Sequence, residues 1–91
     1  MLYAWMGFLN AEAEPISSEL QQLATDFLSQ PVIKIKLFGP LRDELGRRAG
    51  MLMIFEHDSL EAARAYVSDS PFLKAGLYED YRLYEYVNEA G

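Results

Sequence analysis

Two segments of this chain are apolar at almost every position, and they constrain the fold more than any other feature of the sequence. They read LYAWMGFL, from Leu2 to Leu9, and AGMLMIFE, from Ala49 to Glu56. Their length, together with the aromatic residues of the first, favours strands. Alternation separates the first strand into two faces: Tyr3, Trp5 and Gly7 against Leu2, Ala4, Met6 and Phe8. Strands that are apolar on both faces are buried on both faces.

The size and hydrophobic content of the chain indicate a partner. The 91 residues are predicted to form one small domain, residues 1–91, and 51% of them are hydrophobic. A domain of this size has little interior, and soluble monomers rarely expose large apolar patches. We therefore expect a second protein surface to cover part of the apolar area.

Composition argues against several classes of function. The formal net charge of -6 argues against binding to nucleic acid or to an anionic membrane surface. No apolar run reaches the roughly 18 residues of a spanning helix, and the first residues lack the basic region of a signal peptide. Without cysteine, and with one histidine, the chain has no disulfide, no thiol chemistry and no pattern of metal ligands. We expect a cytoplasmic protein without metal or cofactor.

Two segments have the spacing of amphipathic helices. The first runs from Ser18 to about Ser29, with Ser18 and Gln21 as a capping box. Its apolar positions recur at helical spacing: Ile16, Leu20, Leu23 and Phe27. The second helix follows an N-cap at Asp58 or Ser59, since both side chains suit that position.

Two further strands complete the pattern. Val32 to Phe38 alternates and ends at Gly39-Pro40. Its alternation sets Ile33, Ile35 and Leu37 against Lys34 and Lys36. Leu77 to Val87 is the last strand, after a break at Ser70-Pro71. Its alternation sets Tyr81, Leu83 and Glu85 against Arg82, Tyr84 and Tyr86.

The resulting order, βαββαβ, is that of a ferredoxin-like α+β fold. Right-handed crossovers place both helices on one face of a four-stranded antiparallel sheet. The other face stays apolar and uncovered. We therefore predict a homodimer in which two sheets pack face to face and bury more than about 1,000 Å².

The order of motifs resembles the YCII-related family of small dimeric α+β barrel proteins. Gly39-Pro40 precedes a strand, and Glu56 then begins the pattern Glu-x-x-Ser-Leu-Glu-Ala-Ala. Asp69-x-Pro-Phe and the Ala-Gly-Leu that ends at Leu77 follow in the same order. The resemblance covers most of the chain and implies the dimeric barrel fold with a pocket for a small organic molecule.

The resemblance also implies a His-Asp pair, with the histidine early in the first helix. Such a carboxylate fixes the imidazole tautomer and raises its basicity. Asp69 matches the aspartate, whereas the first helix contains no histidine, and Ser18 or Gln22 falls near its place. Neither side chain can act as a base near neutral pH. Asp69 is a candidate acid-base residue or, alternatively, a cap of the turn before Pro71.

Other candidate binding residues lie on the strands and on one loop. Arg42, Arg47 and Arg48 form either a rim that grips an anion or a solvated loop paired with its own acids. Trp5 and Tyr84 either line a pocket for an aromatic ligand or belong to the core or an interface. The lone histidine, at position 57, is interpreted as a solvated turn residue.

The resemblance implies a cofactor-independent enzyme of lyase or isomerase type that acts on a small organic substrate, aromatic substrates included. The missing histidine favours an alternative, a dimeric binding or accessory module without catalysis. A cofactor-free monooxygenase is a third hypothesis. Burial of Asp69 in a pocket would favour the enzyme.

Overall fold

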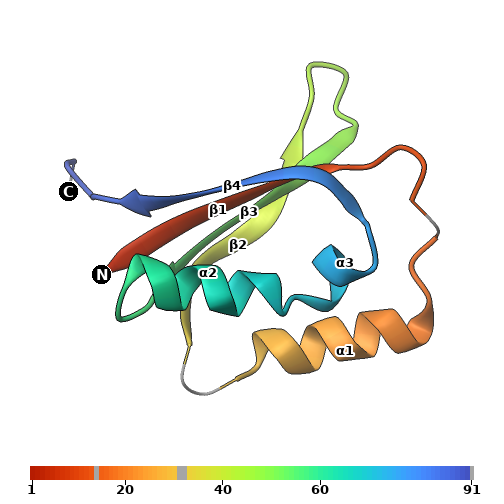
Figure 1. Cartoon of the computed structure of the whole chain (residues 1–91). Coiled ribbons are helices and arrows are strands. Elements are labelled where there is room, and N and C mark those ends of the chain that lie inside the picture. The colour runs from red at the N-terminus through yellow and green to blue at the C-terminus, as the bar shows by residue number, and fades with distance from the viewer. Residues whose placement is uncertain (14, 31–32, 91) are drawn as a thin grey trace.

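Four antiparallel strands form one layer of the structure, and the helices form a second layer on one face of that sheet (Figure 1). The computed structural model describes residues 1–13, 15–30 and 33–90. The elements are β1 (Leu2–Leu9), α1 (Ser18–Leu28), β2 (Lys34–Arg42), β3 (Arg48–Glu56), α2 (Leu60–Ser68), α3 (Pro71–Lys74) and β4 (Tyr78–Tyr86). The strand order β2-β3-β1-β4, antiparallel at each pairing, confirms the predicted ferredoxin-like fold.

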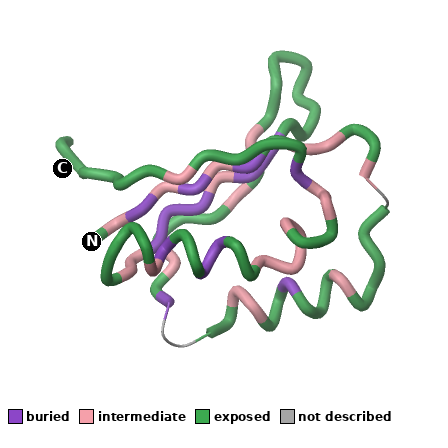
Figure 2. Tube along the Cα trace, in the orientation of Figure 1, coloured by how far each residue is buried: buried purple, intermediate pink, exposed green. Residues whose placement is uncertain are grey.

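The core lies between the sheet and the helices. Figure 2 shows the buried residues concentrated on the two central strands, β1 and β3. Tyr3 and Trp5 pair with Phe55 and Met53 across these strands, and all four side chains are buried. Tyr66 of α2 joins them, and burial raises the pKa of its phenol to about 12. The predicted alternation of the first strand is therefore confirmed.

Both main helices begin at a serine N-cap. The cap of α1 lies one residue before the predicted position, and the cap of α2 is one of the two predicted residues. The hydroxyl of Ser17 accepts the N–H of Leu20 at 3.1 Å, so Ser17 is the N-cap and Ser18 is already helical. The predicted capping box at Ser18 is wrong, because the extended backbone that a cap needs occurs at Ser17. For α2, the cap is Ser59, whose hydroxyl accepts the N–H of Ala62.

The stripe of α1 that faces the sheet also differs from the prediction. Ala24 is buried, and Phe27 and Leu28 are half-buried, whereas Leu23 is 57% exposed. Leu23 was predicted on the inner face from its helical spacing. Leu23 and Ala24 are adjacent in sequence, and it is the small Ala24 that packs against the sheet.

The strand β2 is longer and less regular than predicted. It continues through Gly39 and Pro40, which pair with Leu52 and Met51. An edge strand tolerates proline because one of its sides needs no N–H donor. A bulge at Lys36 shifts the register, so Leu37 faces away from the helices rather than sharing a face with the residues before it. The predicted start of this strand, Val32, lies outside the described residues.

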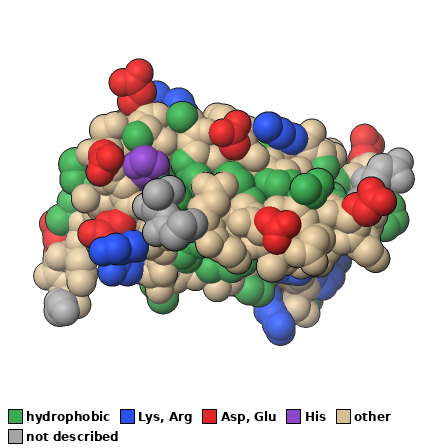
Figure 3. Space-filling view, turned by 90° about the horizontal axis from the view of Figure 1, so that it is seen from below, with side chains coloured by type: hydrophobic (Ala, Val, Ile, Leu, Met, Phe, Trp, Pro, Cys, Tyr) green, Lys and Arg blue, Asp and Glu red, His purple; other side chains and the backbone are tan. Residues whose placement is uncertain are grey.

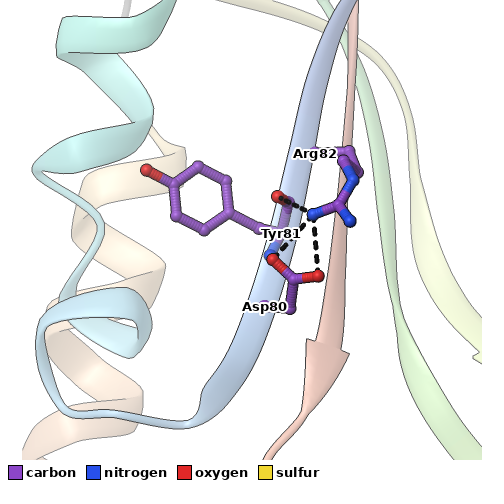
Figure 4. A network of polar contacts seen from close by, with 3 residues as sticks. All are labelled: Asp80, Tyr81 and Arg82. Atoms are coloured by element: carbon purple, nitrogen blue, oxygen red, sulfur yellow. Dashed lines mark hydrogen bonds and ion pairs between the residues drawn. The ribbon is translucent and has the colours of Figure 1, made fainter.

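The face of the sheet away from the helices carries large apolar side chains. The exposed ones are Phe8, Leu37, Tyr84 and Tyr86. On β4, the guanidinium of Arg82 donates to both carboxylate oxygens of Asp80 at 2.7 Å on this side, while Tyr81 points toward the helices (Figure 4). The predicted alternation of β4 is thus confirmed. In the part of the chain that the structure describes, no helix is long and apolar enough to cross a membrane.

Candidate functional site

A cleft of about 300 Å³ opens between α1, α3 and one end of the sheet. Its wall is mostly apolar. Polar side chains reach it from three elements: Gln21 and Thr25 of α1, Arg48 of β3 and Tyr78 of β4. Seen from the helix side, hydrophobic side chains form a band across the middle of this surface, with charged side chains spread around it (Figure 3). A concave, largely apolar site with a few converging polar groups is typical of a small-molecule site.

A small apolar cavity of about 30 Å³ adjoins the cleft. Trp5, Met53 and Val67 line the cavity but not the cleft. The two spaces share part of their wall: Ala24, Leu28, Phe38, Phe72 and Tyr78. The cleft and the cavity therefore form one site, with Arg48 at the outer end and Trp5 at the inner end. We call this the α1 site.

Trp5 occupies the inner end because Gly7 leaves room for its ring. A β-carbon at Gly7 would lie 2.4 Å from the indole and 2.8 Å from the ring of Tyr78. Tyr78 packs edge-on against the indole, with ring centroids 5.0 Å apart. The indole Nε1 of Trp5 is buried and has no hydrogen-bond partner among residues 1–13, 15–30 and 33–90. A buried side-chain donor without a partner is uncommon in folded proteins.

A bulge in β3 brings Arg48 to the outer end. The register passes from Leu41–Gly50 to Arg42–Arg48, which leaves Ala49 unpaired and turns Arg48 toward the α1 site. Burial raises the pKa of the Tyr78 phenol, and the positive charge of Arg48 opposes this shift. The guanidinium of Arg48 therefore acts on Tyr78 electrostatically within the site.

The other arginines of the β2–β3 hairpin behave differently. Arg47 binds Asp43, whose carboxylate accepts the Nε–H of Arg47 at 3.1 Å. Hydrogen bonds from the hairpin, chiefly the backbone N–H of Arg47, lower the pKa of Asp43. Arg42 lies directly across from Arg48 in the strand pair but does not line the α1 site.

Asp69 lies beside the α1 site without lining it. It is the C-cap residue of α2, and the next three residues, Ser70, Pro71 and Phe72, all form part of the cavity wall. Its side chain is 73% exposed, and Oδ1 lies 3.6 Å from the Nζ of Lys74. Its backbone N–H donates to Tyr66 O, so it ends the helix through the main chain.

The remaining predicted residues lie in separate places. Ser18 and Gln22 are exposed on α1, where the amide of Gln22 donates to Asp26 at 2.9 Å. Tyr84 is 55% exposed on the face of the sheet opposite Trp5. Within one chain, the structure therefore brings Trp5 and the neighbours of Asp69 together and leaves Ser18, Gln22 and Tyr84 outside the α1 site.

Comparison with known proteins identifies the family. The YCII-related domain matches residues 1–87. The chain belongs to the YCII-related family. No curated protein is similar enough in sequence to match this YCII-related chain.

Two solved structures are similar to this YCII-related chain. One is 5-chloro-2-hydroxyhydroquinone dehydrochlorinase (TftG) from Burkholderia phenoliruptrix AC1100, in complex with 2,5-dihydroxybenzoquinone. It has a TM-score of 0.77 and 20% identity over 96% of this chain and 94% of that chain. The other is the hypothetical protein PHS023 from Pyrococcus horikoshii, with a TM-score of 0.55 and 13% identity over 98% of this chain and 93% of that chain. At these identities the similarity shows the fold alone.

Sequence reasoning did not single out Gln21, Thr25 and Tyr78 of the α1 site in this YCII-related chain, and it named Arg48 only together with Arg42 and Arg47. Gln21 was considered only as part of a capping box, although it shares a helical stripe with Ala24, Thr25 and Leu28. Arg48 was one of three loop arginines with nothing to distinguish it. Tyr78 begins a strand whose alternation is shifted by a bulge near Leu9. Only the stripe of α1 left a signal in the sequence.

A second, more polar groove of about 300 Å³ lies at the other end of the sheet. It is lined by Met1, Lys34, Glu56, His57 and Asp58. The imidazole Nδ1 of His57 accepts the N–H of Asp58 at 2.9 Å, and the backbone N–H of His57 donates to Met1 O. Across the described ranges, no three acidic, histidine or cysteine side chains are grouped so that they could hold a metal ion.

Proposed function

We propose that this YCII-related protein binds a small organic molecule, aromatic molecules included, in the α1 site, and that it does so as a homodimer. The observation that carries the proposal is the wall that the cleft shares with the adjoining apolar cavity. The walls contain aromatic side chains for a flat ligand, and polar side chains lie at both ends to orient it. The apolar outer face of the sheet supports the homodimer.

The similar fold of TftG supports the choice of an aromatic ligand. That dehydrochlorinase was solved with 2,5-dihydroxybenzoquinone, a flat ring with several oxygen atoms. A ring of this kind suits the aromatic side chains that line the α1 site. We use the same compound as the first probe.

Binding of that probe should depend on the space beside Ala24. Ala24 is 4% exposed and lines both the cleft and the cavity, so the larger Ala24→Met side chain would take up space that a ligand needs. We expect calorimetry to detect 2,5-dihydroxybenzoquinone binding to the wild-type protein and at least about tenfold weaker binding to Ala24→Met. The quenching of the single tryptophan, Trp5, provides a second readout at the inner end.

Ala65→Met is the matched control, because Ala65 is exposed on α2 and lines no part of the α1 site. This variant should bind like the wild type. Circular dichroism would establish that Ala24→Met keeps its secondary structure. Equal binding by the folded Ala24→Met variant and the wild type would place the ligand elsewhere.

The catalytic form of the proposal is a lyase or isomerase in which Asp69 is the acid-base residue. Asp69 directly precedes the cavity wall, which supports this role. Its high exposure and its contact with Lys74 support the alternative, a binding or accessory module without catalysis. The chain offers no histidine in α1 to share the task.

The Asp69→Asn variant distinguishes the catalytic form of the proposal from the binding module without catalysis. The carboxylate is exposed, so the amide should change the free energy of unfolding by less than about 0.5 kcal/mol. If the protein is an enzyme, turnover should fall by about 100-fold or more, because the amide cannot exchange a proton near neutral pH. Lys74→Gln is the control that removes only the ion-pair partner. Unchanged turnover in Asp69→Asn would end the catalytic role of this residue.

A further inference from the structure

The outer end of the α1 site is positively charged although the whole chain is acidic. The formal net charge is -6, yet Arg42 and Arg48 lie directly opposite each other on neighbouring strands. Like charges in this arrangement repel each other and destabilise the sheet. The ion pairs found in the described part of the chain include neither arginine. A bound anion between the strands and α1 would relieve the repulsion.

The α1 site has a charged outer end and an apolar inner end. Arg48 lines only the cleft, and Trp5 lines only the cavity, with Tyr78 in the wall of both. Tyr78 packs against the indole of Trp5. The positive charge of Arg48 lowers the pKa of the Tyr78 phenol and so opposes the effect of burial. A ligand that spans the site therefore meets a guanidinium at the outer end and apolar walls further inside.

From this arrangement, and on the basis of the proposed function, we infer that the ligand of the α1 site is an organic anion. Arg48 binds its carboxylate or phenolate group and determines the preference for charged ligands. The apolar body of the ligand lies along Phe72 and Tyr78. A guanidinium is suited to this task because it donates in a planar fork that matches a carboxylate.

The test compares two compounds of nearly the same shape, 4-hydroxybenzoate and the neutral 4-hydroxybenzamide. Calorimetry at neutral pH and low salt measures both with the wild type, Arg48→Gln and Arg47→Gln. We expect the wild type to prefer the anion by at least about tenfold, as charge-assisted hydrogen bonds are worth that much. Arg48→Gln should lose at least about tenfold for the anion and less than about twofold for the amide.

Arg47→Gln is the matched control, since it removes the same charge one position away, where the arginine is bound to Asp43. It should leave both affinities unchanged. Equal wild-type affinity for the two compounds, equal losses in both arginine variants, or no binding of either compound would overturn the inference. The proposed function is tested separately, by the Ala24→Met experiment. If 2,5-dihydroxybenzoquinone binds and its binding depends on Ala24, the proposed function stands even when the inference about Arg48 fails.

Discussion

We expect Gly50→Ala to be the most destabilising alanine substitution at any glycine of the sheet. A β-carbon at Gly50 would lie 2.2 Å from the carbonyl oxygen of Gly7 on the neighbouring strand. Because that obstacle is backbone, β1 and β3 would have to move apart at the centre of the sheet. Overpacking of this kind costs about 2–3 kcal/mol in the free energy of unfolding. Urea denaturation at a fixed protein concentration measures the loss.

Gly39→Ala is the matched control for this experiment. Gly39 lies on the edge strand β2, and a β-carbon there would have no atom within 4 Å. The same substitution should therefore change the free energy of unfolding by less than about 0.5 kcal/mol. If the two variants unfold at the same urea concentration, the close approach of β1 and β3 is not a constraint on the sequence.

The fold could be predicted because its strongest signals are long and periodic. The apolar strands β1 and β3 and the two helices between strands define the ferredoxin-like order on their own. The errors occur where local geometry overrides periodicity. At Lys36 a single inserted residue shifts the strand register, and period-two reasoning assigns Leu37 to the wrong face.

The same local geometry explains why the α1 site was predicted only in part. Trp5 followed from alternation along a regular strand. Arg48 lines the site because of the bulge at Ala49, and no pattern in the sequence predicts that bulge. The resemblance to the family placed Gln22 among the candidates, near the position of the family's histidine, whereas Gln21 lines the cleft. A shift of one residue rotates a helical side chain by about 100°, which is enough to move it out of a site.

The second large effect is expected at the outer face of the sheet, where Tyr84→Glu should weaken the proposed homodimer. Tyr84 is 55% exposed in the single chain, so the substitution costs the folded chain little. In a symmetric face-to-face dimer the same residue enters the interface twice. Two carboxylates would then lose water without a partner, which costs about 3 kcal/mol, or roughly a hundredfold in the dissociation constant. Analytical ultracentrifugation over a range of concentrations measures this change.

Leu23→Glu is the matched control, because it introduces the same charge at a side chain of nearly equal exposure. Leu23 is 57% exposed on α1, in the helix layer on the opposite side of the sheet. The control should sediment as the wild type does, at twice the mass of one chain, while Tyr84→Glu sediments as a monomer at low micromolar concentration. A monomeric wild type at those concentrations would refute the dimer. Dissociation of the Leu23→Glu variant alone would instead place the interface on the helix layer, since Leu23 would then be part of it.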